Sequence, residues 1–168
     1  MNSRRAFTLI EALLAAVILA MAIMAITMPF TVGAQNEQED ARRSLAVSLA
    51  QEMMEEILSK PFEDPDGHTY TCGPDPGEPW RSKFDNIDDY DGYTEASGNI
   101  TSFDGEVVTT SASLDLTRHV TATYVYVSGQ DTLEDPCFIR VVVEVRYRGN
   151  PVVTLTRLVY ALYEGGGS

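Results

Sequence analysis

The sequence predicts an α+β fold in which a long N-terminal helix precedes an antiparallel β-sheet. Three observations lead to this prediction: an apolar run over residues 7–34, a helix-forming amphipathic segment over residues 35–60, and alternating strand patterns in the last third. The 168 residues suffice for one globular domain and an anchoring segment. We therefore expect the sheet to pack on the amphipathic half of the helix.

Composition argues against nucleic-acid binding and against catalysis. The chain has a formal net charge of −13 and a pI near 4.4, and an acidic surface repels phosphate backbones. His68 and His119 stand far apart, and no GxSxG, P-loop, HExxH or zinc-ligand pattern occurs. The acidic pair Asp88 and Asp89 is adjacent and not set across a cleft, as glycosidase chemistry requires. We predict no catalytic residues and a protein that is not an enzyme.

The apolar run contains one charged residue, Glu11. The following 23 residues, 12–34, carry no charge and would span ~35 Å as a helix, enough to cross a ~30 Å hydrocarbon core. Arg4 and Arg5 precede the run, so the positive-inside rule keeps the N-terminus in the cytoplasm.

Three interpretations of this run are open. It could be a secretory signal peptide ending in the small residues 32–34, although signal-peptide apolar regions are shorter, ~7–15 residues. It could be a plain single-pass anchor. Neither explains Glu11, because a carboxylate at the bilayer centre costs on the order of 2.5–3.5 kcal/mol, and less near the edge. The third interpretation gives Glu11 a partner.

Residues 4–12, Arg-Arg-Ala-Phe-Thr-Leu-Ile-Glu-Ala, resemble the processing site of type IV prepilins and type II secretion pseudopilins. The resemblance implies that prepilin peptidase cuts between Ala6 and Phe7 and that Phe7 is then N-methylated. Most members have Gly where this chain has Ala6. The resemblance also implies that Glu11 of one subunit pairs with the Phe7 amine of a neighbour during fibre assembly.

The same resemblance implies partners and a location. The expected partners are prepilin peptidase, the inner membrane, and other pilin or pseudopilin subunits, which bind through the N-terminal helix. We expect a minor pilin or pseudopilin whose C-terminal domain lies in the periplasm until it enters a type IV pilus or a type II secretion pseudopilus. The alternative is a membrane-anchored periplasmic binding module that does not polymerise.

The helix is expected to run from Phe7 to Lys60. Pro29 predicts a kink within it, and Pro61 predicts its end. Good helix formers fill residues 35–60, and their apolar members form one stripe at three- and four-residue steps. The stripe consists of Ala41, Leu45, Leu49, Ala50, Met53 and Ile57.

Residues 61–106 predict a long irregular region. They contain 12 acidic and two basic residues, with many Pro and Gly. Residues 60–65 and 84–93 resemble the region after the helix in minor pilins of the mannose-sensitive haemagglutinin type.

Two interpretations of the acidic residues in this region are open. Carboxylates could bind Ca²⁺, although their spacing does not match an EF-hand. Otherwise the region is a solvated acidic loop anchored to the core by Phe84, Ile87 and Tyr90. The calcium ligands would be Asp85, Asp88, Asp89 and Asp91.

Residues 107–163 are predicted to form the antiparallel sheet, before a flexible tail at 164–168. Strands are expected at 119–127, at 137–148 and from 151 to about 162, with a further short strand at 106–111. In an exported chain, Cys72 and Cys137 would form a disulfide joining the irregular region to the sheet. The alternative is two buried thiols.

Overall fold

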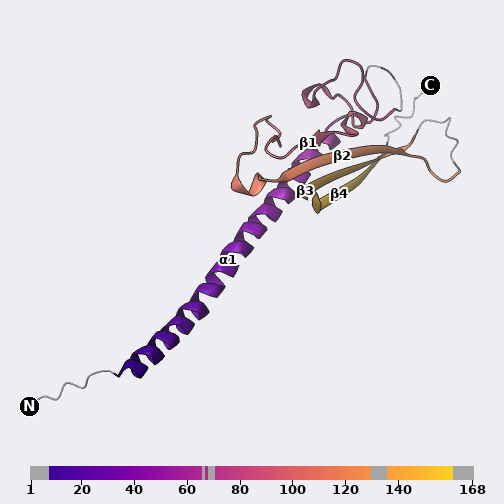
Figure 1. The fold of residues 1–168 in the computed structure, drawn as a ribbon. Helices are drawn as coiled ribbons and strands as arrows, with labels where there is room; N and C mark the ends of the chain where they lie inside the picture. Colours follow the sequence, from indigo (N-terminus) through magenta and orange to yellow (C-terminus); the bar gives the residue numbers. More distant parts are fainter. Residues whose placement is uncertain (1–7, 66, 68–70, 130–135, 161–168) are drawn as a thin grey trace, which may run out of the picture. The chain divides into compact units, whose positions relative to one another are not determined.

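The computed structural model describes residues 8–65, 67, 71–129 and 136–160 (Figure 1). The chain divides into two compact units, Met1–Ala41 and Arg42–Ser168. Within the described residues it contains one α-helix, three short 3₁₀-helices and four strands, which confirms the α+β prediction. In chain order these elements are α1 Leu9–Leu58, η1 Arg81–Lys83, η2 Asp88–Tyr90, β1 Thr94–Glu95, η3 Ser111–Ser113, β2 Leu116–Val125, β3 Phe138–Tyr147 and β4 Asn150–Tyr160.

In the first unit, the Leu9–Thr27 stretch of α1 is apolar around its circumference except at Glu11. Leu9–Thr27 has a mean hydropathy of 2.7 and is long and apolar enough to cross a membrane, by length and composition. None of this stretch is buried within the protein. A helix that is apolar on all sides needs lipid or other helices around it. α1 continues through Pro29, and the kink expected there stays a prediction.

In the second unit, the last part of α1 supplies one side of the core. Of the predicted stripe, Leu49, Ala50, Met53 and Ile57 are buried and Leu45 is partly buried, whereas Ala41 is exposed. Three- and four-residue spacing places the buried residues on one helix face. That face packs against the sheet.

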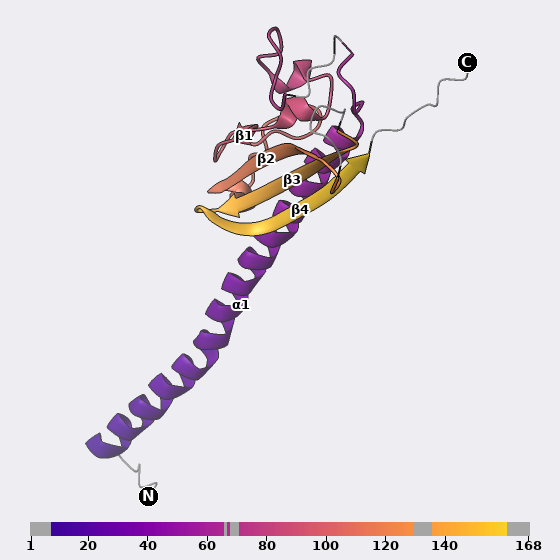
Figure 2. The ribbon, with the colours of Figure 1, turned by 90° about the vertical axis from the view of Figure 1, so that its right-hand side faces the viewer.

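The sheet has the strand order β1-β2-β3-β4, and all its pairs are antiparallel (Figure 2). The predicted alternation on β3 is confirmed, because side chains two residues apart lie on the same face. The buried β3 residues are Ile139, Val141, Val143 and Val145. At the end of β3, Tyr147 lies under the guanidinium of Arg42 from α1, 3.8 Å from the ring centre. These contacts join α1 and the sheet into one core.

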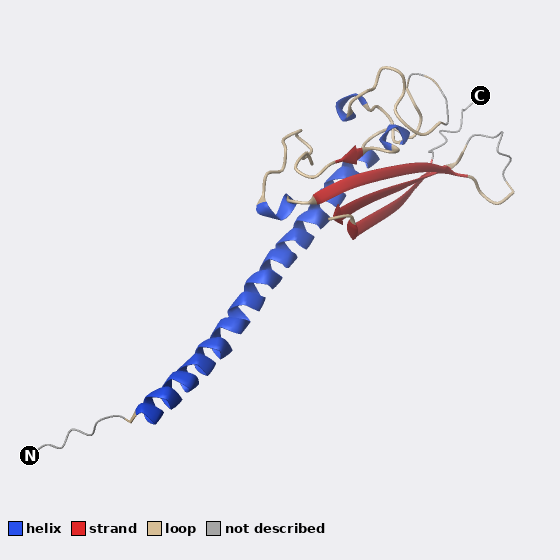
Figure 3. Cartoon of the chain, viewed as in Figure 1, coloured by secondary structure: helices blue, strands red, loops and turns tan. Residues whose placement is uncertain are grey.

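The strand predictions need three corrections. Residues 106–111 form no strand; the segment makes a single bridge, Thr101 with Val107. Instead, the short strand β1 lies inside the region predicted to be irregular, most of which is loop (Figure 3).

β2 begins at Leu116, three residues before the predicted start. β2 was predicted to start too late because of Arg118. This charged residue lies on the core face and interrupts the apolar alternation in the sequence.

Arg118 is 0 % exposed and makes hydrogen bonds that replace its hydration. Its Nε donates to Glu95 Oε2 on β1 at 2.6 Å. Its two terminal nitrogens donate to Leu49 O on α1 at 2.9 Å and to Thr101 O at 2.8 Å. One side chain thus joins β2, β1, α1 and the loop after β1.

A second arginine extends this network. Arg81 Nε donates to Glu56 Oε1 on α1 at 2.8 Å, and its Nη1 donates to Thr101 Oγ1 at 2.7 Å and to Glu95 Oε1 at 3.3 Å. The Tyr90 hydroxyl also donates to Glu56 Oε1, at 2.9 Å. Burial alone would raise the pKa of Glu56, but hydrogen bonds and charge from Arg81 outweigh it and lower that pKa.

The network predicts a large loss of stability on Arg118→Leu. The substitution leaves the buried Glu95 carboxylate without its main partner, which costs about 3–5 kcal/mol. Denaturant unfolding of the full chain in detergent, monitored by circular dichroism, measures the change. As a control, Arg146→Ala removes a partly exposed pair with Glu144 and should cost at most about 1 kcal/mol. Equal losses for the two variants would contradict the prediction.

Candidate functional site

The acidic loop between α1 and β1 is held to the core by the apolar residues that the sequence suggested. Phe84, Ile87 and Tyr90 are all buried. Reciprocal hydrogen bonds shape the turn between them: Asp89 Oδ2 accepts from the backbone N–H of Asp85 at 2.9 Å, and Asn86 Oδ1 accepts from that of Asp89 at 3.1 Å. Such Asx side chains replace backbone partners in tight turns.

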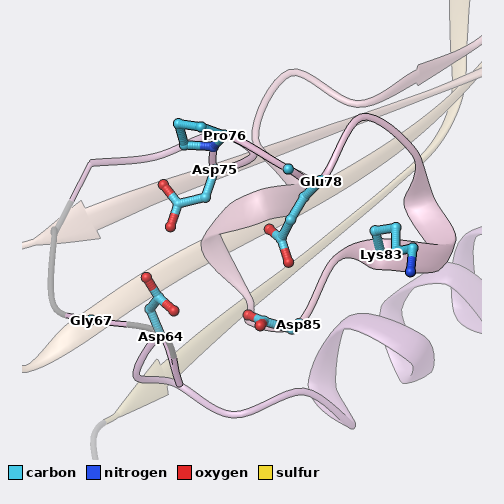
Figure 4. Close-up of a pocket in the computed structure, with 8 residues that line it drawn as sticks. Asp64, Gly67, Asp75, Pro76, Glu78, Lys83 and Asp85 are labelled. Atoms are coloured by element: carbon cyan, nitrogen blue, oxygen red, sulfur yellow. The ribbon is translucent and has the colours of Figure 1, made fainter.

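Carboxylates line a cavity of about 430 Å³ beside this turn (Figure 4). Figure 4 shows the carboxylates of Asp64 and Asp75 facing each other, and that of Glu78 directed toward Asp85. The carboxylate oxygens of Glu78, Asp85 and Asp89 lie within 4.8 Å of one another. This group of three is the part of the described chain best arranged to hold a cation.

The structure brings together only two of the four predicted calcium ligands, Asp85 and Asp89. Asp88 instead accepts a hydrogen bond from the Tyr124 hydroxyl, and Asp91 Oδ1 accepts from the backbone N–H of Ala122 at 2.9 Å. Both residues therefore tie the loop to β2. Glu78 was not among the predicted ligands, because it lies in a Pro- and Gly-rich stretch without a recognisable spacing to Asp85.

The calcium prediction, made for Asp85, Asp88, Asp89 and Asp91, stays a prediction. Ca²⁺ takes 6–8 oxygen ligands, so backbone carbonyls or water would complete its shell. Carboxylates crowded together are also protonated more easily. Burial, and then the negative charge of Asp89, raise the pKa of Glu78 to about 7. Burial raises the pKa of Asp88 to about 6, against hydrogen bonds from Tyr124 and Asn86 that lower it.

The two cysteines are present as thiols, Cys72 partly buried and Cys137 exposed. Burial raises the pKa of the Cys72 thiol, and the nearby backbone of Tyr124 partly offsets this effect. The backbone N–H of Val120 donates to Tyr93 O, and that of Ala122 donates to Asp91 Oδ1, both on the β1 side of β2. Tyr124 is two residues further on, so its backbone N–H points to the same side.

Cys137 directly precedes β3, on the opposite side of β2. The disulfide stays a prediction.

At the other end of the chain, α1 begins with a capped first turn. Thr8 precedes α1, and its backbone oxygen accepts from the N–H groups of Glu11 at 3.1 Å and Ala12 at 3.2 Å. Ala6 and Phe7, the predicted cleavage and methylation residues, lie outside the described residues. Thr8 occupies the N-cap position of α1, where Thr is a favoured residue.

Glu11 lies in the first turn of α1, at the positive end of the helix dipole. None of the salt bridges formed by the described residues includes it. Large apolar side chains surround it on the helix, with Leu9 82 % and Ile10 74 % exposed. A cation that balances this carboxylate in a membrane would therefore come from outside the described residues.

Comparison with known protein families supports the interpretation of this segment. The family model for the prokaryotic N-terminal methylation motif matches residues 1–27. The match indicates a precursor of the type IV pilin-like or pseudopilin-like kind, and the family is structural and not enzymatic. The motif implies processing by prepilin peptidase and assembly with other pilins. No curated protein and no solved structure matches the chain.

The raised pKa of Glu78 predicts that Glu78 makes the second unit less stable as the pH rises. Its folded-state pKa, about 7, exceeds the ordinary value of 4.5, so the folded state binds more protons in this window and stability falls as pH rises through it. Glu78→Gln should therefore gain stability relative to wild type at pH 8, and the difference should shrink at pH 5. Denaturant unfolding at both pH values measures this.

The matched control is Glu63→Gln, an exposed glutamate of the same loop, which should leave the pH dependence unchanged. If the difference in unfolding free energy between wild type and Glu78→Gln stays constant between pH 5 and pH 8, the raised pKa of Glu78 is contradicted.

Proposed function

We propose that this chain is a minor pilin or pseudopilin, cleaved by prepilin peptidase and assembled from the inner membrane into a type IV pilus or a type II secretion pseudopilus. The observation that carries the proposal is the methylation motif over residues 1–27, joined directly to an apolar helix containing one carboxylate. The resemblance of residues 60–65 and 84–93 to minor pilins of the mannose-sensitive haemagglutinin type supports a minor role.

The charges around the helix support an orientation. Arg4 and Arg5 lie before the apolar stretch, so the N-terminus stays in the cytoplasm and the second unit is exported to the periplasm. The subunit waits there as a single-pass membrane protein. It then leaves the lipid for the fibre, where the apolar surfaces of neighbouring helices replace the acyl chains around α1.

Glu11 supports assembly over simple anchoring. A plain anchor gains only the small helix-dipole stabilisation from a carboxylate in its first apolar turn, whereas a fibre can also use it to pair subunits. Cleavage before Phe7 creates a cationic amine, and the Glu11 carboxylate of one subunit can pair with the amine of the next. Because this pairing happens in a low-dielectric environment, a misplaced neighbour leaves both charges unpaired, so the pair fixes the register between subunits.

The alternative function is a membrane-anchored periplasmic binding module that does not polymerise. The acidic cavity beside Glu78 favours it, because a cation or a basic ligand could bind there. The two functions make different demands on the N-terminus: the first requires cleavage and methylation, and the second does not.

The first prediction from this proposal concerns the mature N-terminus. Mass spectrometry of the chain purified from membranes should find N-methylated Phe7 as the first residue. Ala6→Gly, which restores the residue most members have at this position, should be cleaved at least as completely. An intact Met1, or a chain beginning at Gln35, would contradict the proposal.

The second prediction concerns Glu11 and assembly. Glu11→Gln and Glu11→Ala should both be cleaved normally, yet incorporate into sheared fibres at least about tenfold less well, since losing about 1.4 kcal/mol of pairing corresponds to tenfold. Immunoblots of fibre and membrane fractions measure the ratio. Glu37→Gln, an exposed glutamate on the same helix, is the control and should assemble as wild type. Unchanged incorporation of both Glu11 variants would refute the pairing role.

A further inference from the structure

The strand β4 lies along one edge of the sheet. It is last in the order β1-β2-β3-β4, and β3 is its only partner among the described strands (Figure 2). β4 has 11 residues, whereas β1 at the opposite edge has two. An edge strand presents a row of backbone N–H and C=O groups that no neighbouring strand satisfies.

The register identifies those outward groups. Val120 donates to Tyr93 O at 2.9 Å and accepts from the Gly92 N–H at 3.1 Å, so even-numbered residues of β2 point toward β1. The backbone groups of odd-numbered β2 residues therefore hydrogen-bond to those of even-numbered β3 residues. In turn, the backbone groups of odd-numbered β3 residues hydrogen-bond to those of odd-numbered β4 residues. The outward backbone groups therefore belong to Thr154, Thr156, Leu158 and Tyr160.

Exposed or partly buried apolar side chains lie next to this edge on both faces of the sheet. On the face away from the core, Leu158 and Tyr160 are 56 % and 60 % exposed. On the core face, Val153, Leu155 and Val159 are only partly buried. A strand added beside β4 would cover both rows of side chains and satisfy the outward backbone groups.

β4 has few of the features that usually shield an edge. Natural edge strands use charges, prolines or a covering segment. β4 has Pro151 near its start and one charge, Arg157, past its middle. Arg157 donates to Thr156 O at 3.3 Å, and no salt bridge among the described residues includes it.

A second copy of β4 fits this edge poorly. Antiparallel pairing through all the outward residues sets Thr156 opposite Leu158 of the other copy, and therefore sets Arg157 opposite Arg157. That position is a non-hydrogen-bonded pair, where facing side chains come closest, and like charges facing each other destabilise a strand pair. A carboxylate at the same position would form an ion pair.

We propose that the β4 edge binds an extended segment of another protein as a fifth strand, and that this segment places an acidic side chain opposite Arg157 between apolar or β-branched residues. The backbone hydrogen bonds supply a general attraction for any extended chain. The pairing with Arg157 supplies selectivity and fixes the register.

The test uses the full chain in detergent micelles and two synthetic peptides of the length of β4. Both peptides alternate Val and Thr; one has a single central Glu and the other a single central Lys. The Glu peptide should bind about fivefold more tightly, the size of one cross-strand charge pair. Amide hydrogen exchange followed by NMR should show slowing at the outward, even-numbered amides of β4, while the odd-numbered ones, bonded to β3, change little.

Two variants and a control make the test specific. Arg157→Glu should reverse the preference toward the Lys peptide. Thr156→Pro removes an outward N–H without touching the bonds to β3, which edge strands tolerate, and should abolish binding of both peptides. Arg43→Glu reverses an exposed charge on α1, outside the sheet, and should leave the preference unchanged.

Three outcomes would overturn the proposal. The first is equal binding of both peptides, or of neither, to the wild-type chain. The second is unchanged binding by Thr156→Pro. The third is slower hydrogen exchange of the even-numbered β4 amides when the protein concentration rises in the absence of peptide. That result would show that two copies pair through β4.

Discussion

The second unit depends on a charge that has no contact with water. Arg118 is enclosed by the core, so its guanidinium must find acceptors within the protein. It finds them on α1, on β1 and in the loop that follows β1. Each of these segments would have other stable positions if apolar contacts alone held it, because apolar contacts have no direction. The guanidinium has fixed donor directions, and it therefore selects one arrangement.

This constraint explains how a long loop with little regular structure keeps a defined place. Arg81 repeats the role of Arg118 closer to the surface, through Glu56 and Thr101. Farther along the loop, Asp88 and Asp91 fasten it to β2 through a tyrosine hydroxyl and a backbone N–H. Side-chain hydrogen bonds thus fix the position of the loop, as backbone hydrogen bonds between strands do elsewhere in the sheet. The two units differ accordingly: the first presents an apolar helix, and the second contains a polar network inside its core.

The sequence predicted what periodicity and local motifs determine. The apolar run, the helix stripe, the alternation on β3 and the position of Glu11 all follow from residues near one another in the chain. Arg118 was missed because a buried arginine looks like a surface residue until Glu95 is placed beside it, and β2 was therefore predicted to start too late. Glu78 was missed for the same reason: its proximity to Asp85 and Asp89 follows from the path of the loop. The calcium and disulfide predictions stay predictions, and Ala6 and Phe7 lie outside the described residues.

The position of Arg118 along the chain also sets an order of events during synthesis. The Leu49 carbonyl that it binds lies 69 residues earlier, and Glu56, Arg81, Glu95 and Thr101 all precede it as well. In a chain that crosses the membrane with its N-terminus held back, these partners emerge first, and Arg81 can pair with Glu56 and Glu95 before β2 arrives. The hydrogen bonds of Arg118 therefore form only after β2 has emerged, since long-range contacts form only after the intervening chain is available. Because β3 and β4 follow Arg118 in the chain, the core of the second unit is complete only when nearly all of that unit has been made.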